Sequence, residues 1–285
     1  MRALQASAAG PGLIWPRWLV RRDWQLAPVA WPKGRSLRIA VLADPHAGGP
    51  QMPAARLWQA VDAVNSVKAD LIAVMGDYIA DHRFVTAPVP MAEVARAIAS
   101  LQAPLGVFAV MGNHDWRADP VALRARRGPV AYARQLAKAG VRVLENDAHR
   151  IGAEGGLWVL GLGSQRVAQV ERRGPWQGVD DLPATLARVT DDAPALLLAH
   201  EPDIFPHVPP RIALTISGHT HGGQIAFGRW TPVVPSIYGA RYAWGHVHED
   251  GRDLVVSGGL GCSGVPLRFG RRPEVTVITL GERGL

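Results

Sequence analysis

Residues 37–46 read LRIAVLADPH, a run of mostly apolar side chains that ends in an acid and an imidazole. Residues 71–77, LIAVMGD, repeat this arrangement, and residues 107–115, VFAVMGNHD, repeat it again. Short apolar runs bounded by glycine or polar residues predict buried β-strands. Residues 53–68 and 91–101, which lie between these runs, carry apolar side chains at helical spacing. The alternation of strand and helix predicts parallel pairing and therefore an α/β fold.

The remainder of the chain is predicted to be rich in strands. Residues 120–139 are expected to be helical with an interruption at Gly128 and Pro129, and residues 180–189 form the other predicted helix. Further strands are predicted at residues 141–144, 158–162, 195–199, 212–216, 254–257 and 275–280. We find no internal repeat and no linker, so residues 37–285 are expected to form one domain behind an extension of residues 1–36.

The composition leaves the class of partner open. The chain has 285 residues, 48% of them hydrophobic, which is enough to bury a core without disulfides. Its one cysteine, Cys262, cannot form a disulfide within the chain. The net charge of +7 suits an anionic partner such as a phosphorylated substrate, a nucleic acid or an acidic membrane surface. Because nearly all of this positive charge is arginine, a compositional bias toward arginine explains it equally well.

The extension of residues 1–36 allows two interpretations. Four tryptophans lie among its arginines, and two prolines interrupt any long helix: Trp15, Trp18, Trp24 and Trp31, with Pro16 and Pro28. We expect an edge strand or hairpin that covers one side of the domain, and a peripheral segment on a membrane surface is the alternative. No apolar run reaches the roughly 18 residues of a membrane-spanning helix, and we recognise no export signal. The expected location is cytoplasmic, or peripheral on the inner face of the membrane.

Side chains with metal-binding chemistry follow five of the predicted strands at their carboxyl ends. They are Asp44 and His46, Asp77, Asn113 with His114 and Asp115, His200, and His219 with His221. Open α/β sheets present their ligand sites at this edge, so we expect these side chains to meet. Oxygen and imidazole ligands without thiols suit manganese, iron or zinc better than calcium. Gly76, Gly112 and Gly218 each precede such a residue, where a missing side chain permits a sharp turn.

Three other patterns imitate functional motifs but lie in unsuitable surroundings. Residues 147–149, Asp-Ala-His, occur in a polar stretch and are predicted to form a hairpin turn. Residues 245–248, Gly-His-Val-His, lead into a turn at residues 249–251 instead of ending a buried run, so we do not expect them to bind metal. Residues 259–264 match a dinucleotide-binding fingerprint, but Pro266 follows where the helix should begin, which argues against a nucleotide cofactor.

Taken in order from Asp44 to His221, the five groups resemble the motifs of the calcineurin-like metallophosphoesterase superfamily. The resemblance continues in residues 198–203, 217–224 and 259–274, which are similar to the bacterial branch of membrane-associated phosphodiesterases and lipid-linked UDP-sugar pyrophosphatases. It implies a four-layer α/β/β/α sandwich of two mixed sheets flanked by helices, with residues 37–285 as the catalytic domain. Pro45 departs from the pattern, because an apolar residue is commoner there.

The resemblance also implies a role for each residue. One ion would be held by Asp44, His46, Asp77 and His221, and the second by Asp77, Asn113, His200 and His219. Asp77 would bridge the two divalent ions, with manganese expected and iron or zinc as alternatives, and a bridging hydroxide would be the nucleophile. His114 would act in catalysis, with Asp115 either orienting its ring or capping a helix. Arg268 would contact a substrate phosphate, or it is a structural arginine.

The expected function is therefore hydrolysis of a phosphoester, most specifically a phosphodiester or pyrophosphate. The branch that the chain resembles favours a lipid-linked nucleotide sugar such as UDP-2,3-diacylglucosamine, a substrate of lipid A biosynthesis, and contact with a membrane. Two other classes remain open. A non-catalytic metal-binding scaffold would be expected to lack the bridging acid or the catalytic histidine, and neither is missing. A nuclease would suit the basic charge, but basic and aromatic residues do not alternate around the metal motifs, and we expect no obligate nucleic acid.

Overall fold

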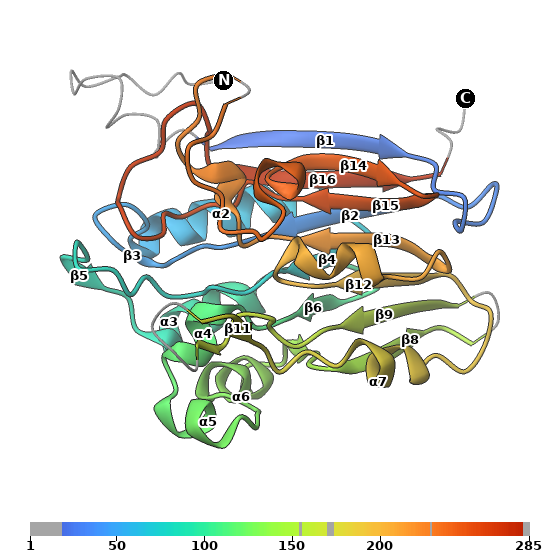
Figure 1. Ribbon diagram of the computed structural model, residues 1–285, viewed down its shortest axis with the longest axis horizontal. Coiled ribbons are helices and arrows are strands. Elements are labelled where there is room, and N and C mark those ends of the chain that lie inside the picture. Colours follow the sequence, from blue (N-terminus) through green and yellow to red (C-terminus); the bar gives the residue numbers. More distant parts are fainter. Residues whose placement is uncertain (1–18, 154–155, 170–173, 229, 282–285) are drawn as a thin grey trace.

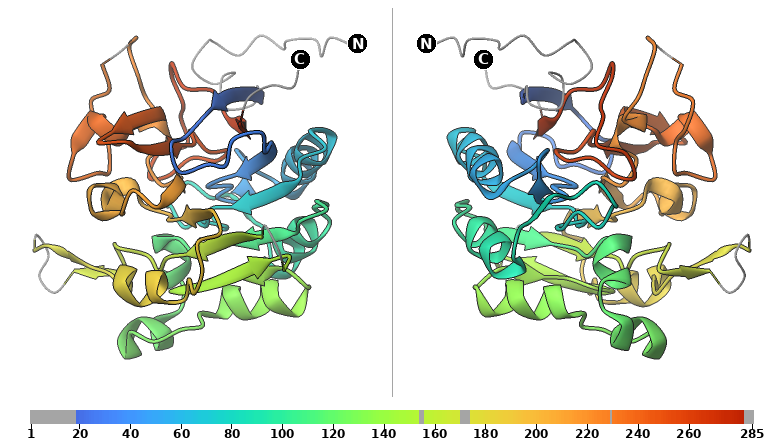
Figure 2. Two further views of the ribbon diagram at one scale, coloured as in Figure 1. Left: turned by 90° about the vertical axis from the view of Figure 1, so that its right-hand side faces the viewer. Right: turned by 90° about the vertical axis from the view of Figure 1, so that its left-hand side faces the viewer.

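The computed structural model describes residues 19–153, 156–169, 174–228 and 230–281. Two six-stranded sheets pack face to face, and helices cover both outer faces (Figures 1 and 2). The arrangement confirms the predicted four-layer α/β/β/α sandwich. Both sheets contain parallel and antiparallel pairs, so both are mixed.

The first sheet contains the strands predicted within residues 37–46, 71–77 and 107–115. Its order is β1 (Val20–Leu26), β16 (Glu274–Leu280), β2 (Leu37–Leu42), β4 (Leu71–Val74), β6 (Val107–Ala109) and β7 (Arg142–Val143). Strands β2, β4, β6 and β7 are parallel neighbours, which confirms the pairing predicted from the strand and helix order. Strand β16 returns antiparallel beside β2, and β1 pairs parallel with β16 at the edge.

The second sheet has a parallel centre and antiparallel edges. Its order is β14 (Gly245–Glu249), β15 (Arg252–Val256), β13 (Ile212–Ser217), β12 (Ala195–Leu198), β9 (Leu157–Gly161) and β8 (Asp147–Ile151). The prediction of a hairpin turn at residues 147–149 is wrong, because these residues begin β8 and pair with β9. Their polar composition reflects an edge strand whose side chains are only half-buried.

Helices close the outer faces. On the first sheet lie α2 (Ala54–Ser66), α3 (Met91–Ala99) and α6 (Ala131–Lys138), and on the second lie α7 (Leu182–Ala187) and the 3₁₀ turn η2 (Pro202–His207). Short helices α4 (Asn113–Arg117) and α5 (Pro120–Ala125) precede α6, and the break predicted at Gly128 and Pro129 is confirmed. The remaining elements are η3 (His221–Gly223), η4 (Gly239–Tyr242) and the strand pairs β3 (Gly48–Gly49) with β5 (Ala87–Pro88) and β10 (Ala168–Gln169) with β11 (Trp176–Gln177).

The apolar runs of the central strands line the interface between the two sheets. Ile39 and Val41 of β2 face Leu214 and Ile216 of β13 within one buried cluster, while Ala40 and Leu42 contribute to the cluster beneath the helices. Strands covered on both faces need apolar side chains at successive positions. This burial explains why the central strands read as unbroken apolar runs, and it fixes the ends of those strands in a rigid frame.

The described part of the extension forms a sheet edge. Strand β1 pairs with β16 along its whole length, Trp24 on it is half-buried between the sheets, and Trp31 is buried. Because β1 is at the end of the strand order and pairs parallel with β16, residues 20–26 form the edge strand of the first sheet. Trp15 and Trp18 lie outside the described residues. Within residues 19–281 as described, no helix is long and apolar enough to cross a membrane.

Candidate metal centre

The carboxyl ends of five strands converge at one end of the sandwich. Asp44 and His46 follow β2, Asp77 follows β4, and Asn113 follows β6. The second sheet adds His200 after β12 and, after β13, His219 and His221. Since the two sheets face each other, the ends of their parallel strands meet, and every one of these side chains is buried.

Asp77 is the residue that both halves of the cluster share. Its Oδ2 atom lies 3.4 Å from Nε2 of His46 and 3.3 Å from Nε2 of His200. His46 Nε2 is in turn 3.2 Å from Nε2 of His221. Two groups of ligand atoms result, each within 4.8 Å: Asp44, His46, Asp77 and His221, and Asp77, His200 and His219. The structure therefore brings together the histidines and aspartates that sequence analysis singled out.

Several buried atoms in this cluster have no hydrogen-bond partner. They are Oδ1 of Asn113, Nδ1 of His46, Nε2 of His200 and Nδ1 of His219. An unpaired buried polar atom costs about 1–3 kcal/mol, so four in one place call for a ligand that accepts lone pairs. The other ring nitrogens of His200 and His219 contact the carbonyls of Met75 and Pro235, the second at 2.9 Å. These contacts orient the rings, and the donor set fits divalent metal ions.

The backbone around the cluster is held in a rarely occupied conformation. Five of the candidate ligands have φ between 40° and 67°, namely Asp44, His46, Asp77, His219 and His221. Side chains other than glycine seldom adopt this left-handed region, and such strain concentrates at functional sites. A Cβ atom on Gly112 would lie 2.2 Å from Oδ1 of Asp77, and one on Gly218 would lie 2.6 Å from Oδ2 of Asp44. Both glycines are therefore required for the carboxylates to occupy their positions.

The charge of the cluster favours an ionised Asp77. Burial raises the pKa of this carboxyl, but the nearby charges of His200 and His114 outweigh burial and hold the pKa well below its ordinary value. Asp44 differs, because burial raises its pKa to about 6 and the charge of Asp77 adds to the effect. Two carboxylates this close repel each other unless a cation lies between them.

His114 is oriented by Asp81, and the predicted role of Asp115 in orienting this ring is wrong. Nδ1 of His114 lies 2.7 Å from Oδ2 of Asp81, and Nε2 lies 4.0 Å from Asp77, facing the cluster. The Asp115 carboxylate instead accepts hydrogen bonds from the backbone N–H groups of Gly112 and Asp77, at 2.7 and 2.8 Å, and of Tyr78. Asp115 caps α4 and fixes the loop that carries Asp77, which is the alternative that sequence analysis left open.

Asp81→Asn is expected to lower kcat of any reaction in which His114 takes part about 10- to 100-fold, the range for partners that orient an imidazole. Asparagine keeps the shape of the side chain but cannot hold the ring of His114 through a charged contact. Because Asp81 contacts no candidate ligand, metal content and KM should stay unchanged. Steady-state kinetics with metal analysis by mass spectrometry test this, and loss of metal from the variant would contradict the assignment.

The structure places Arg268 as a structural arginine, which is the alternative to the phosphate contact that the sequence left open. Its side chain is fully buried, and its guanidinium donates to the carbonyls of Gly261, at 2.7 Å, and Gly258, at 2.8 Å. Nη2 also lies 3.1 Å from Nδ1 of His221. Arg268 therefore ties the loop after β15 to the ring of a candidate ligand.

A cavity of about 550 Å³ opens beside the cluster. Besides Asp77 and His114, its lining includes Arg117, Arg166 and Trp176, none of which sequence analysis identified. The guanidinium of Arg166 lies 4.9 Å from the ring centre of Trp176, and its Nη1 lies 3.5 Å from Nε2 of His219. Arg117 is three residues after His114 in α4, a helical spacing that points both side chains the same way and could have revealed it.

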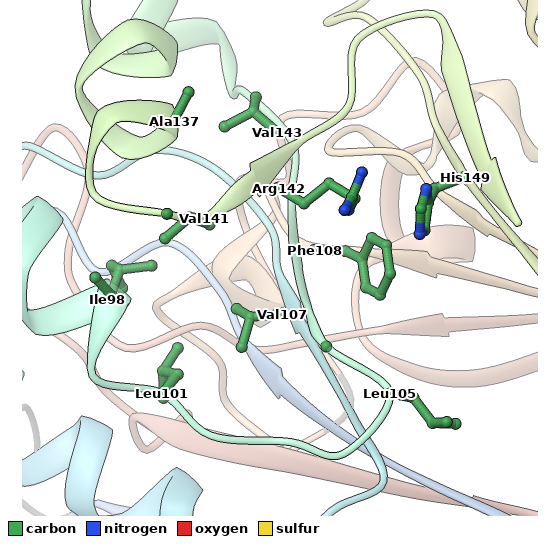
Figure 3. Close-up of a pocket in the computed structure, with 13 residues that line it drawn as sticks. Ile98, Leu101, Leu105, Val107, Phe108, Ala137, Val141, Arg142, Val143 and His149 are labelled. Atoms are coloured by element: carbon green, nitrogen blue, oxygen red, sulfur yellow. The ribbon is translucent and has the colours of Figure 1, made fainter. Parts of the chain in front are cut away.

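A second cavity of similar volume lies away from the metal centre, at the amino-terminal ends of β6 and β7. Figure 3 shows its mostly aliphatic lining, with Arg142 and His149 at one side of Phe108. His149 belongs to the Asp-Ala-His pattern of residues 147–149, and its ring packs 5.6 Å from that of Phe108. This cavity brings no set of carboxylates and imidazoles together, so the chemistry belongs to the first one.

The sequence profile of the calcineurin-like phosphoesterases matches residues 37–250, which include every candidate ligand. The chain belongs to the calcineurin-like phosphoesterase family. Members similar to it include metallophosphoesterase YkuE of Bacillus subtilis, with 30% identity over 226 residues that cover 76% of this chain and 70% of that protein. A metallophosphoesterase of Aquifex aeolicus is 29% identical over 253 residues, covering 89% and 88% of the two chains. A transmembrane protein with metallophosphoesterase domain from Bos taurus is 28% identical over 256 residues, covering 87% and 54%.

Proposed function

We propose that this calcineurin-like phosphoesterase hydrolyses a phosphodiester or pyrophosphate bond with two divalent ions, manganese being the expected metal. The observation that carries the proposal is the position of Asp77, one carboxylate in contact with two separate histidine groups. Bound there, the ions would supply Lewis-acid charge and lower the pKa of a water molecule to generate the nucleophile. Asp44, His46 and His221 would hold the first ion, and Asn113, His200 and His219 the second, with Asp77 shared.

The residues around the cluster support a role in phosphoester chemistry. His114 faces the cavity with Asp81 behind it, a pair suited to protonate a leaving oxygen and to stabilise charge in the transition state. Arg117 and Arg166 line the same cavity, and guanidinium groups are well matched to phosphate oxygens. The same cavity is thus lined by a candidate proton donor and by two guanidinium groups that could bind phosphate.

An apolar surface beside the metal centre supports a lipid-linked substrate. Six exposed apolar side chains lie in two loops, one after His221 and one after β15: Phe227, Trp230, Val233, Ile237, Val265 and Leu267. A mostly apolar cavity of about 330 Å³ connects these loops to His221 and is lined by Ile225, Val233 and Val265 among others. Exposed apolar side chains gathered next to a site are typical of lipid or membrane contact. This surface favours substrates such as UDP-2,3-diacylglucosamine and a peripheral position on a membrane.

The basic test is hydrolysis of a chromogenic phosphodiester by metal-stripped protein to which manganese is returned. We expect activity that requires the added metal and that cobalt, iron or zinc restores to different extents. Phosphomonoesters, phosphodiesters and pyrophosphates compared side by side would rank the substrate classes. Folded protein that binds two ions but is inactive on all three classes would favour the non-catalytic scaffold instead.

The combined variant Phe227→Ser/Trp230→Ser is expected to lower kcat/KM for a lipid-linked pyrophosphate in vesicles by at least about tenfold, because two aromatic side chains no longer bury apolar surface against the lipid. Activity on a water-soluble diester should change less than twofold. Val29→Ser provides a control, since Val29 is also exposed but is remote in sequence from both loops. Equal losses on both substrates would show that the loops shape the metal centre and do not bind lipid.

A further inference from the structure

The edge hairpin of the second sheet carries a separate set of metal-binding side chains. His246 and His248 lie two residues apart on β14, so both point to the same face of the sheet. Asp253 on β15 is the direct cross-strand neighbour of His248 and shares that face. The pairing of the two strands thus brings two imidazoles and one carboxylate together. The sequence alone predicts that residues 245–248 lead into a turn and do not bind metal.

The three side chains converge closely. Oδ1 of Asp253 lies 2.6 Å from Nε2 of His246 and 3.0 Å from Nδ1 of His248. One ligand atom from each residue fits within 4.8 Å of the others. Both imidazoles therefore crowd a single carboxylate oxygen, the arrangement expected of ligands that surround a cation.

The second oxygen of the carboxylate provides an independent observation. Asp253 is 5% exposed, and its Oδ2 atom is buried without a hydrogen-bond partner. The contacts with the two histidines satisfy Oδ1 but leave Oδ2 without a partner. An unpaired carboxylate oxygen in a buried position is costly in free energy. A cation that both oxygens of this carboxylate contact, together with the two imidazoles, would satisfy it.

We propose that His246, His248 and Asp253 form a third metal site, distinct from the centre at Asp77, for a borderline divalent cation such as zinc. Two imidazoles and one carboxylate suit zinc, copper or nickel, and calcium or magnesium would prefer a set made of oxygens. His248 is half-exposed, so the remaining coordination positions are open to water. The ring of His246 packs 6.4 Å from that of Trp24 on β1, so an ion here braces the open edge where the two sheets meet.

The test counts zinc ions per chain in protein saturated with zinc and then freed of excess metal. We expect three ions in the natural protein and two in His246→Gln/His248→Gln, whose phosphoesterase activity should be unchanged. His149→Gln/His207→Gln is the matched control and should keep three. Two ions in the natural protein, or three in the hairpin variant, would overturn the proposal.

Two further measurements keep the outcome decisive if the double variant does not fold. His248→Gln alone changes a half-exposed side chain and should weaken binding of the third zinc ion at least tenfold. Anomalous scattering at the zinc edge from crystals of the natural protein should give a peak between His246, His248 and Asp253. A map with peaks at the Asp77 centre alone would overturn the third site and leave the proposed function intact.

Discussion

Asp77→Asn is expected to abolish hydrolysis, with a loss of about 10⁴-fold or more in kcat/KM, because one substitution removes the shared ligand of both ions and so disables the nucleophile. Metal content at the Asp77 centre should fall from two ions to one or none. The carboxylate contacts His46 and His200 through the same oxygen, and an amide in that position cannot hold two cations together. Mass spectrometry of the folded protein alongside kinetics would measure both effects.

The matched control for this substitution is Asp62→Asn. Asp62 lies on the exposed face of α2, and its substitution by asparagine changes the net charge by the same amount as Asp77→Asn does. It should leave activity and metal content as they are. If Asp77→Asn kept two ions at the Asp77 centre and most of its activity, the shared carboxylate would not be the basis of catalysis.

His114→Gln is expected to lower kcat about 10²- to 10⁴-fold for a substrate with a poor leaving group, the usual contribution of a positioned proton donor. The effect should shrink for a nitrophenolate, which leaves without being protonated. No candidate metal ligand is removed, so both ions of the Asp77 centre should remain bound. The comparison of the two leaving groups within one variant separates proton donation from general damage to the site.

His82→Gln serves as the control, since His82 lines the same cavity and its Nδ1 atom accepts a hydrogen bond from the backbone N–H of Phe84. It should lower kcat by less than about threefold on either substrate, as expected for a side chain outside the proton pathway. An equal loss with both leaving groups in His114→Gln would assign this histidine to charge stabilisation and not to proton donation.

The fold and the metal-binding side chains were predictable because they depend on the same local pattern. Buried parallel strands read as apolar runs, and the residues that follow them lie at one edge of the sheets, as Asp77 and His200 do. The edge strands β8 and β14 were not predicted, because their polar, half-buried side chains do not alternate between apolar and polar positions. The pairing that places Asp253 beside His248 could not be inferred without those strands.

Two details of the site could not be predicted: which carboxylate orients the ring of His114, and that Arg268 is buried. Asp115 is adjacent to His114 in the chain whereas Asp81 lies 33 residues before it, so the choice between them depends on the path of the loop after β4. Arg268 lies in a glycine-rich segment that suggests an exposed loop, yet that loop folds back so closely that a Cβ on Gly261 would lie 2.2 Å from the carbonyl oxygen of Pro45. Such contacts arise from tertiary packing, which sequence periodicity does not record.

The most direct test of the central claim is anomalous diffraction from crystals grown with manganese. Our account predicts two strong peaks, one on each side of the Asp77 carboxylate, the first beside Asp44, His46 and His221 and the second beside Asn113, His200 and His219. A single peak at this cluster, or two peaks that do not share Asp77, would contradict the proposed two-ion centre.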